Sequence, residues 1–214
     1  APEDVKMPSS LTLEGSVTAP NKITLSGRQN WIAFPSNLLI GLKSASFLYI
    51  VNEPVELNLI TIRPSGEQTS GHKVDIKIVK EEWKSIKKAM LGGRYEWVSE
   101  LIKKDIKKES VTSCPDSTPI KFTPTEPGYY YLYAETKDEK GRSSGCQIYF
   151  YVGGKGYAGW QMRDDDIIEL VPDKDKYQVG DTAKILVKSP YDSANVLITV
   201  ERELILRKYT KKLH

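Results

Sequence analysis

Histidine, cysteine and long apolar runs are all scarce in this 214-residue sequence, which has two histidines and two cysteines. His72 lies in a Ser-Gly-His turn and His214 is terminal, so histidine-based triads and multi-histidine metal sites have almost no material. Apolar runs such as residues 47–51 fall far short of the roughly 20 residues that a membrane-spanning helix needs. We therefore expect no enzyme activity, no cofactor, no metal and no transmembrane segment.

The two cysteines, Cys114 and Cys146, leave two readings open. They could form a disulfide in an oxidising compartment, or they could be two inert thiols. Cys146 shares the alternation of Ile148 and Phe150, which predicts a side chain that points into the core. An exposed nucleophile is not expected at that position.

An excess of charge of one sign is also lacking. The chain has 31 basic and 28 acidic residues and a net charge of +3, so nucleic acid is not an expected partner. The local excess of positive charge falls in residues 80–108, where we expect strands joined by a long charged loop. Its lysines are interpreted as protection of a sheet edge against aggregation, with an anionic partner as the alternative.

Short alternating runs separated by turn signals occur along the chain, and they are typical of antiparallel β-sandwiches. Residues 38–153 are predicted to form one complete sandwich. Residues 1–37 contain a hairpin pattern that cannot bury a face alone, so we interpret them as the last strands of a preceding domain. The glycine-rich start of residues 154–164 is read as a linker, because it lacks the helix and the Ser/Thr of a phosphate-binding loop.

Residues 165–214 are predicted to begin a further sandwich. The Asp164–Asp166 run is read as a solvated strand start rather than a calcium site, because ligand-loop spacing is missing. Residues 183–187 and 196–200 alternate and are separated by a turn, which predicts a half-buried hairpin. Ile185 would then lie on its apolar face and Lys188 on its polar face.

The segment Pro127, Gly128, Tyr129 and Tyr130 resembles the tyrosine corner of immunoglobulin-like and fibronectin-like sandwiches. In that corner a tyrosine hydroxyl ties the turn before a late strand. Tyr129 also shares a strand face with the tyrosines at 131 and 133. This face is either a covered aromatic ladder or an exposed platform, and the second reading leaves a fibronectin-like adhesion or carbohydrate-binding module as an alternative function.

A series of residues in the last quarter of the sequence forms a signature in order and spacing: Asp173, Lys174, Tyr177, Gly180, Asp181, Thr182, Ala183, Ser189, Pro190, Val200, Glu201 and Arg202. This signature resembles the bacterial branch of the α2-macroglobulin family, at the start of the domain that carries the protease bait. The resemblance extends upstream through the Pro127–Tyr130 segment, the 138–142 turn and Trp160, which close one macroglobulin-type domain in that family.

The resemblance implies tandem immunoglobulin/fibronectin-III-like sandwiches leading into a bait-region domain. It implies a non-catalytic scaffold within a broad-spectrum protease inhibitor, whose bait is cut and which then collapses around the attacking protease. Its partners would be proteases and neighbouring macroglobulin domains of the same chain, and its location extracytoplasmic, either periplasmic, on the cell surface or secreted. The family's Cys-x-Glu-Gln thioester motif matches the surroundings of neither cysteine.

No single residue is predicted as the bait. The apolar run Leu204–Leu206 indicates that the strand before it simply continues. The residues that would suit a trypsin-like protease are Arg202, Arg207, Lys208, Lys211 and Lys212.

Overall fold

The computed structural model describes residues 7–89, 95–154, 168–174, 176–189, 191 and 193–213. Every helix or strand in these residues is a β-strand. The prediction of an all-β fold with antiparallel sheets is therefore confirmed. The predicted domain boundaries stay a prediction. Most of the expected linker, with Trp160 and the Asp164–Asp166 run, lies outside the described residues.

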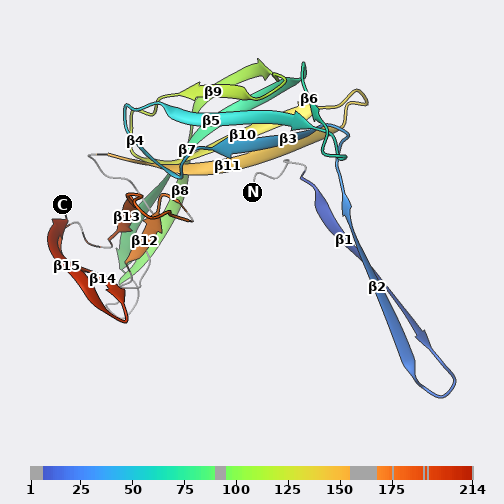
Figure 1. Cartoon of the computed structure of the whole chain (residues 1–214), viewed down its shortest axis with the longest axis horizontal. Coiled ribbons are helices and arrows are strands. Elements are labelled where there is room, and N and C mark those ends of the chain that lie inside the picture. The colour runs from blue at the N-terminus through green and yellow to red at the C-terminus, as the bar shows by residue number, and fades with distance from the viewer. Residues whose placement is uncertain are drawn as a thin grey trace.

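Two sheets pack face to face and form a β-sandwich (Figure 1). The larger sheet has five strands in the order β4-β11-β10-β7-β8. In the smaller sheet β5 pairs with β3, β6 and β9. The strands are β3 (Leu39–Ser44), β4 (Leu48–Ile50), β5 (Val55–Ile62), β6 (Gln68–Thr69), β7 (Lys73–Ala89), β8 (Tyr95–Thr112), β9 (Thr118–Phe122), β10 (Gly128–Lys137) and β11 (Ser143–Gly153).

Strand alternation builds the core between the sheets. On β10, Tyr130, Leu132 and Ala134 point inward and are at most 2% exposed. Leu57 and Leu59 of β5 face them from the smaller sheet and belong to the same buried cluster. Because successive side chains of a strand point to opposite faces, the residues between these positions lie on the outside of the sandwich.

The β7/β8 pair is a long ribbon that continues beyond the sandwich (Figure 1). The expectation of strands rather than helices in this basic stretch is confirmed. The expected long charged loop is wrong, because the charged residues lie within the two strands, which run to residue 89 and start again at residue 95. Its lysines are largely paired within the ribbon, since Lys103 lies 2.8 Å from Glu81 and Lys77 lies 2.8 Å from Asp105. Local pairing of this charge favours the edge-protection interpretation over an anionic partner.

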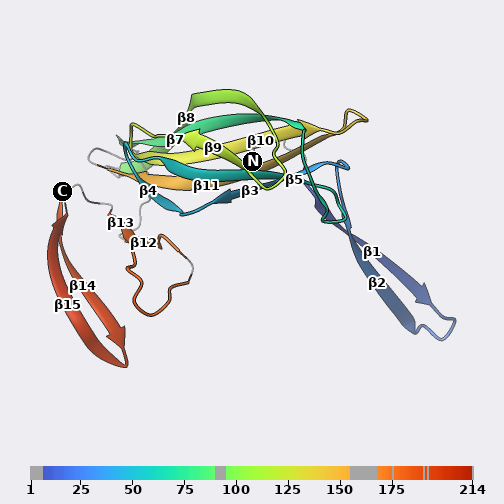
Figure 2. The same cartoon turned by 45° about the horizontal axis from the view of Figure 1, so that its top comes forward.

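The hairpin of β1 (Ser9–Thr18) and β2 (Thr24–Ala33) extends away from the sandwich (Figure 2). One face is a polar ladder in which Arg28 Nη2 lies 2.6 Å from Glu14 Oε2. The register places the apolar residues together on the opposite face, and all of them are exposed. These residues are Leu11, Leu13, Val17, Leu25 and Trp31.

Asp138 fixes the point where this hairpin meets the sandwich. Its carboxylate accepts hydrogen bonds from the Asn37 amide at 3.1 Å and from the Arg142 amide at 2.9 Å, and it pairs with the Arg142 guanidinium at 2.7 Å. Burial raises the pKa of Asp138, but the hydrogen bonds from Arg142 and Asn37 outweigh burial and hold the pKa well below its ordinary value. The β10–β11 turn therefore anchors the chain just before β3.

Replacing Leu132 by Ala should lower the free energy of unfolding by about 2–5 kcal/mol, because it opens a cavity where no side-chain surface is exposed. The matched control is Leu13→Ala on β1, where the leucine is 62% exposed, and its effect should stay within about 0.5 kcal/mol. Urea unfolding followed by near-ultraviolet circular dichroism measures both. Equal losses for the two variants would contradict the assignment of the core.

Asp138→Asn should lower the Tm at pH 7, whereas Glu139→Gln, in the same turn and exposed, should not. The folded-state pKa of Asp138 is depressed, so its contribution is present above the ordinary carboxyl range and is lost as the pH falls from about 4 through the folded pKa. The Tm difference from the unsubstituted chain should therefore narrow in acid. Scanning calorimetry at several pH values measures it, and a pH-independent difference would argue against this anchor.

Candidate functional site

The predicted tyrosine corner contains the expected type of hydrogen bond, and the tyrosine that makes it is Tyr130. Its hydroxyl donates to the Glu126 carbonyl at 2.9 Å, and its ring stacks on Phe150 with centroids 5.7 Å apart. Gly128 has a φ of 141°, and a Cβ there would lie 2.9 Å from Lys80 Cε. The corner therefore requires glycine at 128 and fixes the start of β10, with Tyr129 on the outer face.

The outer faces of β10 and β11 carry a row of aromatic rings. Tyr131 is parallel to Tyr133 within 12° at a centroid distance of 6.0 Å, and within 27° to Tyr149 at 5.6 Å. Phe47 meets the far side of Tyr149 edge-on at 5.5 Å. Burial raises the pKa of Tyr131 to about 12. Since the ring faces pack on one another, this row is not a flat platform on which a sugar could stack.

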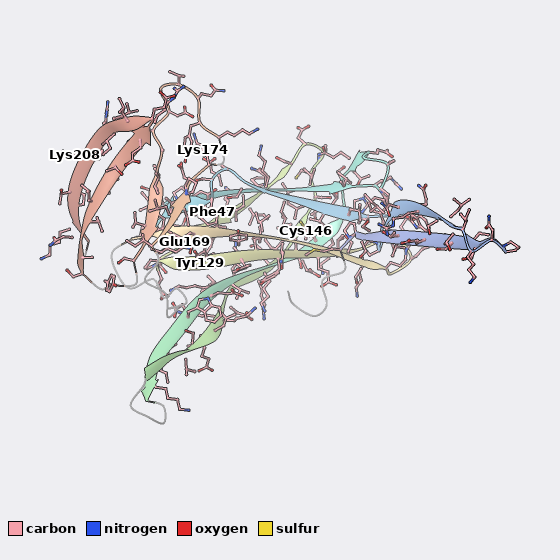
Figure 3. The ribbon with its side chains drawn as sticks, turned by 90° about the horizontal axis from the view of Figure 1, so that it is seen from below. Phe47, Tyr129, Cys146, Glu169, Lys174 and Lys208 are labelled. Atoms are coloured by element: carbon pink, nitrogen blue, oxygen red, sulfur yellow. The ribbon has the colours of Figure 1, made fainter. Side chains whose placement is uncertain are left out.

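A second hairpin lies against one end of this row (Figure 3). Its strands are β12 (Glu169–Pro172) and β13 (Ile185–Lys188), paired with Glu169 opposite Lys188. Lys188 Nζ lies 2.8 Å from Glu169 Oε1 and 5.2 Å from the centre of the Tyr129 ring. The Phe47 amide donates a hydrogen bond of 3.4 Å to the Asp173 carbonyl. We call the side chains of Tyr129, Glu169 and Lys188, together with the Phe47–Asp173 backbone hydrogen bond, the seat.

Polar contacts keep the lysine of the seat charged despite its burial. Burial lowers the pKa of Lys188, but the ion pair with Glu169 and a hydrogen bond with Tyr129 outweigh burial, so the pKa ends above its ordinary value. The lysine is therefore a cation in the seat, and its side chain is only 12% exposed. Burial likewise raises the pKa of Tyr129, which stays a neutral phenol. The seat thus combines one buried cation, one carboxylate and an aromatic edge.

The predicted hairpin of residues 183–187 and 196–200 is wrong in both pairing and orientation. β13 pairs with β12, and β14 (Ala194–Arg202) pairs with β15 (Leu204–Leu213). Lys188, expected on the polar face, points at the sandwich, whereas Ile185, expected on the apolar face, is 53% exposed. Alternation separated the two faces correctly but could not say which one a neighbouring sheet covers.

The signature residues Tyr177, Gly180 and Asp181 organise the loop between β12 and β13. The Tyr177 hydroxyl donates to Asp173 Oδ1 at 2.6 Å, and the same oxygen accepts the Lys184 amide at 2.9 Å. These hydrogen bonds from Tyr177 and Lys184 lower the pKa of Asp173. Gly180 has a φ of 96° in the turn that Asp181 closes by accepting the Gln178 amide. These hydrogen bonds join residues of the loop and its flanking strand ends, and none of them involves the sandwich.

The remaining signature residues lie beyond this loop and are not brought together with it. Ser189 is buried and its hydroxyl accepts the Tyr191 amide at 3.1 Å, while Pro190 lies outside the described residues. Glu201 and Arg202 are exposed at the end of β14. Glu203, with a φ of 62°, reverses the chain there, so the expected continuous strand through Leu204–Leu206 is wrong.

Both cysteines are free thiols in the structure, which therefore agrees with two unpaired thiols rather than with a disulfide. Cys114 is exposed and Cys146 is half-buried beside the core. Burial raises the pKa of the Cys146 thiol. In the part of the chain that the structure describes, no group of three or more metal-binding side chains occurs, and no helix is long and apolar enough to cross a bilayer.

Sequence reasoning missed four residues of the seat region: Phe47, Tyr151, Glu169 and Lys188. The contact between Tyr129 and Tyr151 could have been predicted, because the alternation of β11 puts Tyr151 on the outer face. The centres of the two rings lie 5.0 Å apart. No signal in the sequence distinguishes Lys188 from an ordinary solvent-facing lysine. Its role depends on a contact between segments that are far apart along the chain.

Comparison with known proteins finds sequences that are similar to this chain over nearly its whole length. The family described as "Alpha-2-macroglobulin bait region domain" matches residues 168–212. An α2-macroglobulin homolog of Nostoc sp. is 25% identical over 201 residues, which are 94% of this chain and 10% of that protein. An α2-macroglobulin of Ralstonia nicotianae is 34% identical over 89 residues, 42% of this chain and 5% of that protein.

The fold agrees with a solved structure as well. The native conformation of Escherichia coli α2-macroglobulin superposes with a TM-score of 0.53 at 15% identity, covering 96% of this chain and 14% of that one. The chain spans about a tenth of the length of the Nostoc relative. The chain is therefore similar to bacterial α2-macroglobulins over nearly its whole length, and its residues 168–212 match the bait region domain of that family.

Proposed function

We propose that this chain is a non-catalytic scaffold segment of a bacterial, broad-spectrum protease inhibitor of the α2-macroglobulin type, which traps proteases after bait cleavage. The observation that carries the proposal is the match of residues 168–212 to a bait region domain, joined in one chain to a β-sandwich. Proteases and neighbouring macroglobulin domains are the partners, and the location is extracytoplasmic. The non-catalytic role also rests on the scarcity of histidine.

The domain plan is part of the same proposal. Residues 1–37 are the last strands of a preceding macroglobulin-like domain, which accounts for the exposed apolar face of the β1/β2 hairpin. Residues 38–153 are one sandwich, residues 154–164 a linker, and residues 165–214 the first strands of the bait region domain. The signature from Tyr177 to Arg202 then has a structural role in that last domain.

The β14/β15 hairpin is exposed, as the β1/β2 hairpin is, and of these two hairpins it is the one that lies within the bait region match. All its residues up to Lys212 are exposed or half-buried, and the two strands pair only with each other. A protease binds its substrate as an extended chain with free edges, which the sandwich strands do not offer. The basic residues here, Arg202, Arg207, Lys208, Lys211 and Lys212, would be cut by a trypsin-like protease.

The alternative function, a fibronectin-like adhesion or carbohydrate-binding module, depends on an open and flat tyrosine face. That condition is not met at Tyr129, which lies under Lys188, nor at Tyr131, whose ring packs between Tyr133 and Tyr149. The geometry therefore favours the scaffold.

The test uses the longer natural protein that contains this chain, mixed with trypsin. If trypsin is trapped, cleavage of a large protein substrate should fall strongly while cleavage of a small chromogenic peptide continues, because a cage excludes substrates by size. Changing the five basic residues of β14/β15 to Gln should abolish protection against trypsin but leave protection against an elastase-type protease. The matched control changes five exposed lysines of the sandwich, and it should behave as the unsubstituted protein. Equal cleavage of both substrates with the unsubstituted protein would contradict the proposal.

A further inference from the structure

The contact between the β12/β13 hairpin and the sandwich is small for a joint between two domains. Each strand of the hairpin has four residues, and a lone two-stranded hairpin is marginal in water. In the described part of the chain, no strand of the sandwich pairs with either of them. The hairpin is therefore held in place by the seat, through Lys188 with Tyr129 and through the Phe47–Asp173 hydrogen bond.

The two faces of the hairpin differ in burial in the way that a docked hairpin requires. Lys188, Leu186 and Val171 lie on the face toward the sandwich and are partly buried. On the opposite face Leu170 is 61% exposed and Ile185 is 53% exposed, while Val187 is partly buried. The face with the lysine is thus the more covered of the two, although Glu169 at its edge is 63% exposed.

A paired cation at the centre of such a contact gives orientation more than affinity. Lys188 and Glu169 pair within the hairpin and Glu169 is 63% exposed, so the pair holds the ammonium in place but is not itself a contact across the joint. Its geometry is nevertheless specific, because the ammonium must reach both the carboxylate at 2.8 Å and the Tyr129 ring. A contact of this kind can hold the hairpin in one orientation on the sandwich, and it can also break without large loss of buried surface.

The two sides of the joint are each held together without it. Tyr129 belongs to the corner fixed by the Tyr130–Glu126 hydrogen bond. The hairpin loop is closed by Asp173, which binds Tyr177 and Lys184. Opening the joint therefore breaks neither of these local networks.

We propose that Lys188 is the tie that fixes the bait region domain in one orientation on the sandwich, and that this joint can release the domain without unfolding either side. Among the described residues, the polar contacts of the joint are Lys188 with Tyr129 and one long hydrogen bond of 3.4 Å, so removing the lysine charge should loosen it most. The structural part of the proposal rests on these contacts. Only its use in trapping, where a cut bait would be followed by movement at the joint, rests on the proposed function.

Pulsed electron resonance between two spin labels tests the joint in this chain. One label is placed on the exposed Cys114 and the other on Leu170→Cys, on the outward face of β12, with Cys146→Ala to prevent labelling at the half-buried thiol. The unsubstituted Lys188 should give one narrow distance distribution. Lys188→Met keeps the length and apolar stem and removes the charge, and it should broaden the distribution at least twofold.

The matched control is Lys184→Met, an exposed lysine just before the same strand whose contacts to Asp173 are made by its backbone. It should leave the distribution narrow. Amide exchange in the Lys188→Met variant should stay slow at Lys184 and in β10. A narrow distribution with Lys188→Met, a broad one in the unsubstituted chain, or fast exchange at Lys184 would each overturn the proposal. None of these results depends on whether the protein traps proteases.

Discussion

The alternation of β10 is the constraint on which the rest of this structure depends. Because neighbouring side chains of a strand point to opposite faces, the same strand that buries Tyr130 and Leu132 presents Tyr129 and Tyr131 outward. The hydrogen bond from Tyr130 to the Glu126 carbonyl fixes where this alternation starts. A shift of one residue would move the core side chains into solvent and remove the seat at the same time.

The seat shows how a rigid sandwich can carry a separate domain without a large interface. Tyr129 and Phe47 belong to the sandwich, and Glu169 and Lys188 belong to the hairpin (Figure 3). Lys188 contacts the Tyr129 ring, and Phe47 donates its amide to Asp173 at the end of β12. The ion pair within the hairpin holds the Lys188 ammonium over the Tyr129 ring, so this contact gives direction more than affinity. Such a contact is compatible with the proposed movement of the hairpin.

Much of the fold could be predicted from the sequence, because local alternation and turn chemistry determine it. The short alternating runs between turn signals predicted the β-strands, and the Pro127–Tyr130 segment predicted the tyrosine corner. The wrong strand pairing beyond residue 183 has a physical cause. Alternation defines two faces of a hairpin, but the contact that buries one of them is made by a sheet more than 30 residues away along the chain. The reversal at Glu203 was missed because glutamate seldom adopts a positive φ, so no glycine or asparagine marked the turn.

The β12/β13 hairpin is seated on the sandwich through Lys188 and Tyr129. A nuclear Overhauser experiment on the isotope-labelled chain, between the side-chain methylene protons of Lys188 and the ring protons of Tyr129, measures this contact. Clear cross-peaks between them and shifts of the lysine methylenes caused by the ring are expected. Absence of these cross-peaks, with lysine methylene shifts at random-coil positions, would contradict this contact.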